Sequence, residues 1–82
     1  MNVPLESENA LELARIGAGL GAGLATIGVG MGIGKIGATA NEGIARQPDA
    51  AADIRGGSII LSAFIEGVCL FAVAVTLLIM IL

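Results

Sequence analysis

Glu66 is the only charged residue among the last 27 positions of the chain. The apolar stretch around it, residues 56–82, is long enough as a helix to cross a bilayer at about 1.5 Å per residue. Glu66 then lies about 15 Å from one end and about 24 Å from the other. A carboxylate at that depth costs from about 3 to more than 10 kcal/mol, so desolvation favours the protonated form. Because acids inside membranes are rare and functional by default, we expect Glu66 to bind an ion reversibly.

Two side chains share the helix face of Glu66, namely Ser62 at i−4 and Cys69 at i+3. Ser62 has two available acceptors, the carboxyl of Glu66 and a backbone carbonyl of its own helix. If a hydrogen bond only holds Glu66 neutral, the acid is structural and carries no ion. Cys69 is more typical of a small apolar side chain than of a reactive one.

The composition is that of a membrane protein, with 56% hydrophobic and 13% charged residues, the latter about half the usual share. The absence of histidine excludes a histidine metal site or base, and the single cysteine excludes an internal disulfide. Three of the four basic residues, Lys35, Arg46 and Arg55, lie in or near the central connection, which predicts a cytoplasmic loop with both termini outside. The acidic first residues lack signal or transit character, which favours a bacterial inner membrane or an organelle-encoded chain.

Four segments are predicted. Residues 1–15 form an acidic extension that lies on the membrane surface or is disordered, and residues 16–45 form the first transmembrane helix. Residues 46–55 form a polar loop with Pro48, which cannot continue a helix. Residues 56–82 form the second transmembrane helix. The expected fold is an all-α transmembrane hairpin.

The first apolar segment is unusually rich in glycine, with nine of the 13 glycines between positions 17 and 37. On a helix, pairs four residues apart allow close approach of a neighbour. Glycines two residues apart lie about 200° apart round the helix, so two sides of this helix lack side chains. Two such sides predict neighbours on both sides, as in a closed ring of hairpins. Simple dimers also use glycine-rich helices. The packing glycines are predicted to be Gly28, Gly30, Gly32 and Gly34. Counting back from the turn places Gly30 and Gly32 opposite Glu66.

Together these residues resemble the c-subunit of F-type ATP synthases, which is the proteolipid of the membrane rotor. The resemblance covers about Ile27 to Phe71 and includes the alternating glycines, the stretch EGIARQPDA from Glu42 to Ala50, and the sequence AFIEG around the acid. It implies a homo-oligomeric ring with the first helix inside and the second outside in lipid. Such a protein is a non-catalytic transport component, without a metal, a cofactor or a nucleic-acid partner.

The resemblance also implies roles for individual residues. A proton would enter through a half-channel in the a-subunit of the stator, neutralise Glu66, travel through lipid, and leave where a stator arginine favours ionisation. Rotation of the ring would then be coupled to ATP synthesis. The loop would contact the gamma and epsilon subunits of the central stalk through Arg46, Gln47, Pro48 and Asp49.

Departures from the family pattern bear on the ion. Sodium-binding relatives carry a glutamine, a hydroxyl residue and a tyrosine where this chain has Ile33, Gly67 and Phe71. We therefore predict proton transport, with a water or the carbonyl of Phe64 accepting the hydrogen of the protonated acid and Ser62 in support. The alternatives are a sodium-coupled rotor, a small proton-coupled exporter, and a structural or pore-forming hairpin such as a holin.

Overall fold

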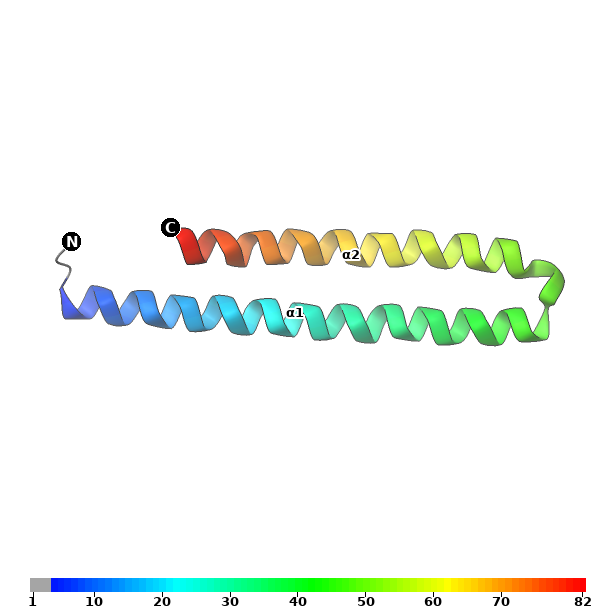
Figure 1. Ribbon diagram of the computed structural model, residues 1–82, viewed down its shortest axis with the longest axis horizontal. Coiled ribbons are helices and arrows are strands. Elements are labelled where there is room, and N and C mark those ends of the chain that lie inside the picture. The colour runs from blue at the N-terminus through cyan, green and yellow to red at the C-terminus, as the bar shows by residue number, and fades with distance from the viewer. Residues whose placement is uncertain (1–3) are drawn as a thin grey trace.

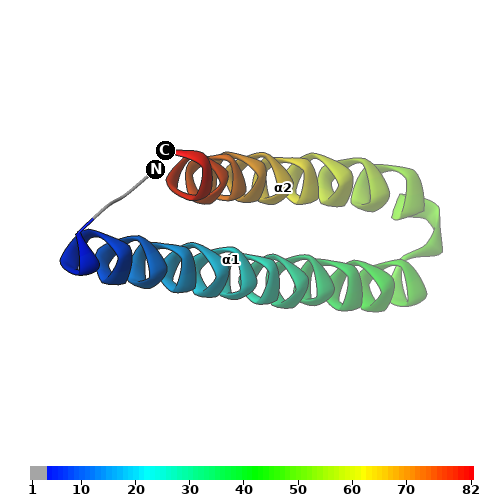
Figure 2. The same cartoon turned by 60° about the vertical axis from the view of Figure 1, so that its left-hand side comes forward.

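The computed structural model describes residues 4–82 as a hairpin of two long helices (Figure 1). Helix α1 runs over Leu5–Arg46, a single 3-10 turn, η1, over Pro48–Ala50, and helix α2 over Ala51–Ile81. The hairpin measures 66 × 15 × 10 Å, and the helices stay side by side when it is turned (Figure 2). The predicted all-α hairpin is confirmed.

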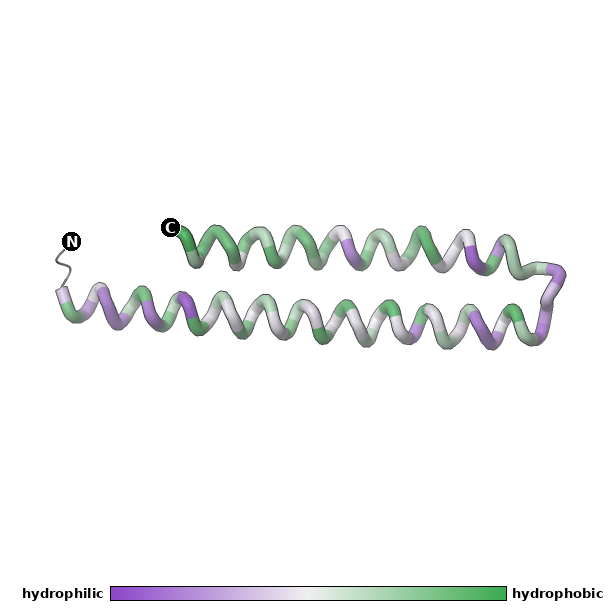
Figure 3. The backbone as a smooth tube through the Cα atoms, viewed as in Figure 1, coloured by the Kyte–Doolittle hydropathy of each residue, from purple (hydrophilic) through white to green (hydrophobic). Residues whose placement is uncertain are grey.

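Both helices are long and apolar enough to span a membrane. Glycine costs about 1 kcal/mol per position in a water-exposed helix, which would penalise the glycine-rich α1. Inside a bilayer, however, every backbone N–H and C=O must be bonded within the segment, so the helix is the available solution. Polar segments lie at the start of α1 and around the turn, with apolar segments between them (Figure 3). The apolar parts of the two helices therefore occupy the same membrane layer.

The turn is made by Gln47 and Pro48. Gln47 leaves the helical region, with φ −133° and ψ 74°, as expected for a residue that precedes proline. Its N–H still donates to the carbonyl of Gly43 at 2.8 Å, and the N–H of Ala50 donates back to the carbonyl of Gln47 at 3.0 Å. Two short hydrogen bonds thus satisfy backbone groups at the end of one helix and the start of the next.

The helices extend further than the apolar segments alone. Residues 51–55, predicted as part of the loop, already belong to α2, and residues 5–15, predicted as a surface or disordered extension, are continuous with α1. Residues 1–3 of the predicted extension lie outside the described part. Helix α1 therefore projects past the end of α2 at the terminal end of the hairpin (Figure 1).

Three glycines of α1 fix the register of the hairpin. At each of them, an added Cβ would lie 3.3–3.4 Å from a branched side chain of α2. The pairs are Gly21 with Thr76, Gly32 with Ile65, and Gly43 with Ile54. Successive pairs are 11 residues apart on both helices, and 11 residues complete about three helical turns. The same faces of α1 and α2 therefore meet along most of the hairpin.

Little of the hairpin is buried. Ala18 is the one described residue that is almost fully covered, with 2% of its surface exposed. Large apolar side chains are exposed along both helices, among them Met31, Phe64, Val68 and Phe71. A continuous apolar surface of this kind is covered by lipid or by neighbouring chains in a membrane protein.

Candidate functional site

Glu66 occupies the centre of α2, with 15 residues before it and 15 after it within the 31-residue helix. Its neighbour Ile65 packs on α1, and consecutive residues lie about 100° apart on a helix. Glu66 consequently projects sideways from the hairpin, where it lines a shallow hollow of about 440 Å³ between the two helices. The carboxyl is thus presented at an open flank and not locked between α1 and α2.

The hollow beside Glu66 is mostly aliphatic, with a few polar side chains. Ser62 lies one turn from Glu66 toward the loop, and Arg55 and Asn41 lie at the loop end of the same hollow. The side of the hairpin that carries this hollow is called the Glu66 flank below. Its polar groups are arranged along the hairpin from Glu66 toward the turn.

The hydroxyl groups near the site differ in their bonding. Ser58 donates to the carbonyl of Ile54 at 2.7 Å, which occupies its proton within its own helix. Within residues 4–82 the other side-chain hydrogen bonds are those of Thr26 and Thr76, each to its own helix. Within the same residues Ser62 makes neither of the two hydrogen bonds considered for it, to the carboxyl of Glu66 or to a carbonyl of its own helix. Its hydroxyl is therefore available to a carboxyl or a water.

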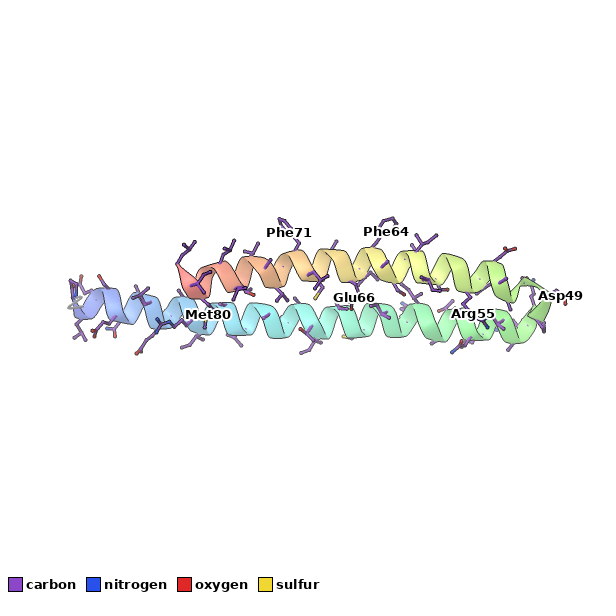
Figure 4. The ribbon with its side chains drawn as sticks, turned by 45° about the horizontal axis from the view of Figure 1, so that its top comes forward. Asp49, Arg55, Phe64, Glu66, Phe71 and Met80 are labelled. Carbon is purple, nitrogen blue, oxygen red and sulfur yellow. The ribbon has the colours of Figure 1, made fainter. Side chains whose placement is uncertain are left out.

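Phe64 lies on the other side of α2. It precedes Ile65, as Glu66 follows it, so the two side chains point to opposite flanks. Phe64 lines a second hollow, of about 400 Å³, together with Gly28, Val68 and Cys69. This side is called the Phe64 flank. Figure 4 shows Phe64 and Phe71 projecting from the edge of α2 turned away from α1, whereas Glu66 lies nearer α1.

Two residues predicted near Glu66 have side chains that point away from it. The side chains of Phe64 and Glu66 lie on opposite flanks, while the backbone carbonyl of Phe64, which is the predicted hydrogen-bond acceptor, stays a prediction. Cys69, predicted on the helix face of Glu66, lines the hollow of the Phe64 flank.

The four predicted packing glycines are not equivalent. Gly32 lies against α2, where an added Cβ would meet Cδ1 of Ile65 at 3.4 Å. At Gly28, Gly30 and Gly34 an added Cβ would meet nothing within 4 Å. Gly32 thus packs inside the hairpin, and the other three leave room for atoms from outside the chain.

The positions that distinguish sodium-binding relatives lie on different sides of the hairpin. Ile33 lines the hollow beside Glu66, so an aliphatic side chain stands on the Glu66 flank. Gly67 is in open space. Phe71 is 74% exposed and projects from the edge of α2 turned away from α1 (Figure 4).

The predicted stalk-binding residues gather at the tip of the hairpin. Arg46 is the last residue of α1, Gln47 links the helices, and Pro48 and Asp49 belong to η1. All four are exposed, and Asp49 lies at the extreme end of the molecule in Figure 4. The turn presents them together, away from the apolar part of both helices.

The family model for the C-subunit of ATP synthase matches residues 16–79, which include both helices, the turn and Glu66. The chain belongs to the ATP synthase c-subunit family. The c-subunit of Phocaeicola vulgatus is 55% identical over 76 residues, which cover 93% of this chain and 90% of the relative. That of Bacteroides thetaiotaomicron is 58% identical over 70 residues, covering 85% and 82%. The chloroplastic c-subunit of Cyanidioschyzon merolae is 45% identical over 62 residues, covering 76% of each chain. No solved structure matches significantly.

Membership of the c-subunit family settles several sequence predictions. The chain is a membrane rotor component of ATP synthase and not its catalytic part, and it assembles into the ring of that family. The exporter and holin alternatives are wrong. Its bacterial relatives and two apolar helices make it an inner-membrane protein.

Two residues of this rotor hairpin were not singled out from the sequence as neighbours of Glu66. Asn41 and Arg55 line the same hollow as the acid. Arg55 had a detectable signal, because it precedes Glu66 by 11 residues and three helical turns return to nearly the same face. Asn41 had none, since its place depends on the register between the helices.

Proposed function

We propose that this rotor hairpin carries protons, with Glu66 as the group that is protonated and deprotonated once per passage of the ring past the stator. The proposal rests on one observation, which is that the carboxyl at the centre of α2 shares its hollow with Ile33 where a sodium site needs an oxygen ligand. Sodium, like other hard cations, requires several oxygen atoms at once. A proton requires only the carboxylate.

The chemistry at Glu66 is a reversible proton transfer. A proton that arrives through an aqueous half-channel in the a-subunit of the stator converts the carboxylate into a neutral carboxyl, which can face lipid at small cost. When the carboxyl returns to the stator, a cation within about 4–6 Å favours the ionised form and releases the proton to the second half-channel. The exposed position of Glu66 at the edge of α2 suits both transfers.

The two flanks suggest how ring neighbours complete the site. A ring joins unlike surfaces of successive copies, so the Glu66 flank of one hairpin meets the Phe64 flank of the next. This contact brings the Phe64 segment of one copy toward Glu66 of its neighbour. The backbone carbonyl of Phe64 in the adjacent copy then accepts the hydrogen of the protonated carboxyl.

The loop and the orientation follow from the same proposal. Arg46, Gln47, Pro48 and Asp49 bind the gamma and epsilon subunits of the central stalk, which places the turn on the cytoplasmic side and both termini outside. A proton that crosses 100 mV releases about 2.3 kcal/mol, so several passages must be summed for each ATP. A ring with one Glu66 per copy performs that summation.

The test is carbodiimide labelling of Glu66 in the detergent-extracted ring, because carbodiimides modify protonated carboxyls. We expect a large oligomer that is labelled at Glu66, with labelling suppressed by rising pH and unaffected by sodium. The Glu66→Gln variant should form rings that are not labelled and transport nothing. Protection by sodium at constant pH would overturn the proton assignment in favour of a sodium rotor.

A further inference from the structure

The contact between Gly32 and Ile65 lies directly beside the ion-carrying residue. Ile65 presents Cδ1 and Cγ2 at 3.4 Å and 3.9 Å from the position of a Cβ on Gly32. Glu66 is the next residue of the same helix. Any movement of Ile65 along or around α1 therefore carries Glu66 with it, because the two share one rigid helical turn.

The shapes of the two residues make this contact specific. Isoleucine is branched at Cβ and has one strongly preferred side-chain rotamer in a helix, so it transmits a displacement instead of absorbing it. Glycine offers a surface without side-chain atoms, which lets the isoleucine lie on the backbone of α1. Ile65 is part-buried there, while Glu66 is exposed at the flank.

Gly32 contacts α2, whereas the glycines around it do not. Gly28, Gly30 and Gly34 have nothing within 4 Å of an added Cβ, so they do not hold α2. The equivalent contacts, Gly43 with Ile54 and Gly21 with Thr76, lie three turns away in either direction. These two contacts also hold the helices together, but each lies about 16 Å along the hairpin from Glu66.

We propose that Gly32 and Ile65 are positioning residues for proton transfer, because their contact sets the rotation and depth at which α2 presents Glu66. The inference rests on the proposed role of Glu66 as proton carrier. Exchange with a stator cation requires an approach to about 4–6 Å, and an error of about 1 Å in a reacting group can cost about 100-fold in rate. The chain meets that requirement with a fixed contact one residue away from the carboxyl.

The experiment compares Gly32→Val with Gly43→Val in assembled rings, using the pH profile of carbodiimide labelling at Glu66. Both variants add the same side chain to α1 against an isoleucine, so their costs in helix formation and packing are matched. We expect Gly43→Val to keep the parental profile. Gly32→Val should shift the profile and slow proton-driven transport by about tenfold.

A compensating pair gives a second readout. Gly32→Val combined with Ile65→Ala restores the volume at the contact, since three carbon atoms are added and three removed. This pair should return the labelling profile toward that of the parent. If Gly32→Val fails to assemble, Ile65→Ala compared with Ile54→Ala replaces it, and only the former should shift the profile.

Equal shifts in the Gly32 and Gly43 variants, or no shift at Gly32, would overturn the positioning role. So would a compensating pair that moves no closer to the parent. A parent ring whose labelling does not depend on pH would instead overturn the proposed function, which keeps the two failures separate.

Discussion

Ser62 lies one helical turn from Glu66 on α2 and lines the same hollow. Its hydroxyl is engaged by no hydrogen bond among residues 4–82, whereas the hydroxyl of Ser58, one turn further toward the loop, donates to the carbonyl of Ile54 at 2.7 Å. The two serines thus have the same chemistry and different availability. This difference offers a matched pair for testing which groups support the carboxylate.

The Ser62→Ala variant should increase carbodiimide labelling of Glu66 at a fixed pH. A hydroxyl that donates to the carboxylate stabilises the ionised form by about 1 kcal/mol, so its loss should raise the labelled fraction by up to about fivefold. Ser58→Ala should leave the labelling unchanged. Labelling that changes equally in both variants, or in neither, would show that Ser62 gives Glu66 no hydrogen bond.

The ion preference should be convertible by adding oxygen atoms. We expect the double variant Ile33→Gln with Gly67→Ser to gain sodium protection of Glu66, because Ile33 lines its hollow and Gly67 has open space around it. The measurement is the labelling rate at constant pH with increasing sodium. Sodium should have no effect on the parent ring.

The matched control for this conversion is Ile36→Gln with Gly67→Ser. Ile36 also lines the hollow beside Glu66, nearly one turn closer to the loop, so the same amide enters the same hollow further from the carboxyl. This control should remain insensitive to sodium. Equal protection in both double variants would mean that any added amide suffices and that position 33 has no special role.

Ring assembly should depend on Gly28 more than hairpin folding does. Gly28 lines the hollow of the Phe64 flank, and an added Cβ meets nothing within its own chain. Gly28→Leu should therefore leave the helical content unchanged while it blocks the neighbouring copy, which lowers the mass of the detergent-extracted oligomer. Gly67→Leu, which projects from α2 away from α1, should keep the parental mass. An intact ring from Gly28→Leu would place the interface elsewhere.

Much of this arrangement could be predicted from the sequence, because bilayer length, charge and proline position are local properties. They indicated two helices, the turn at Pro48 and the isolated acid at Glu66. The distinction between Gly32 and its neighbours Gly30 and Gly34 could not be predicted, since it depends on the rotation of one helix against the other within a fraction of a turn. The place of Cys69 in the hollow of the Phe64 flank depends on the same rotation. The helical state of residues 5–15 could not be predicted from membrane length and hydropathy, because that segment carries three glutamates and an arginine.

Attachment of the stalk should depend on charge at the tip of the hairpin. Arg46 is exposed at the end of α1, next to Gln47 and Pro48, so Arg46→Glu reverses a charge on the proposed contact surface. We expect ATPase activity retained on washed membranes to fall, with binding weakened about tenfold, equivalent to about 1.4 kcal/mol. Labelling of Glu66 should be unchanged, because the tip lies about 20 residues away.

Lys35→Glu makes the same charge change on an exposed residue of α1 about 16 Å from Arg46, and should retain the ATPase. Equal losses in both variants would point to net charge and not to a contact at Arg46.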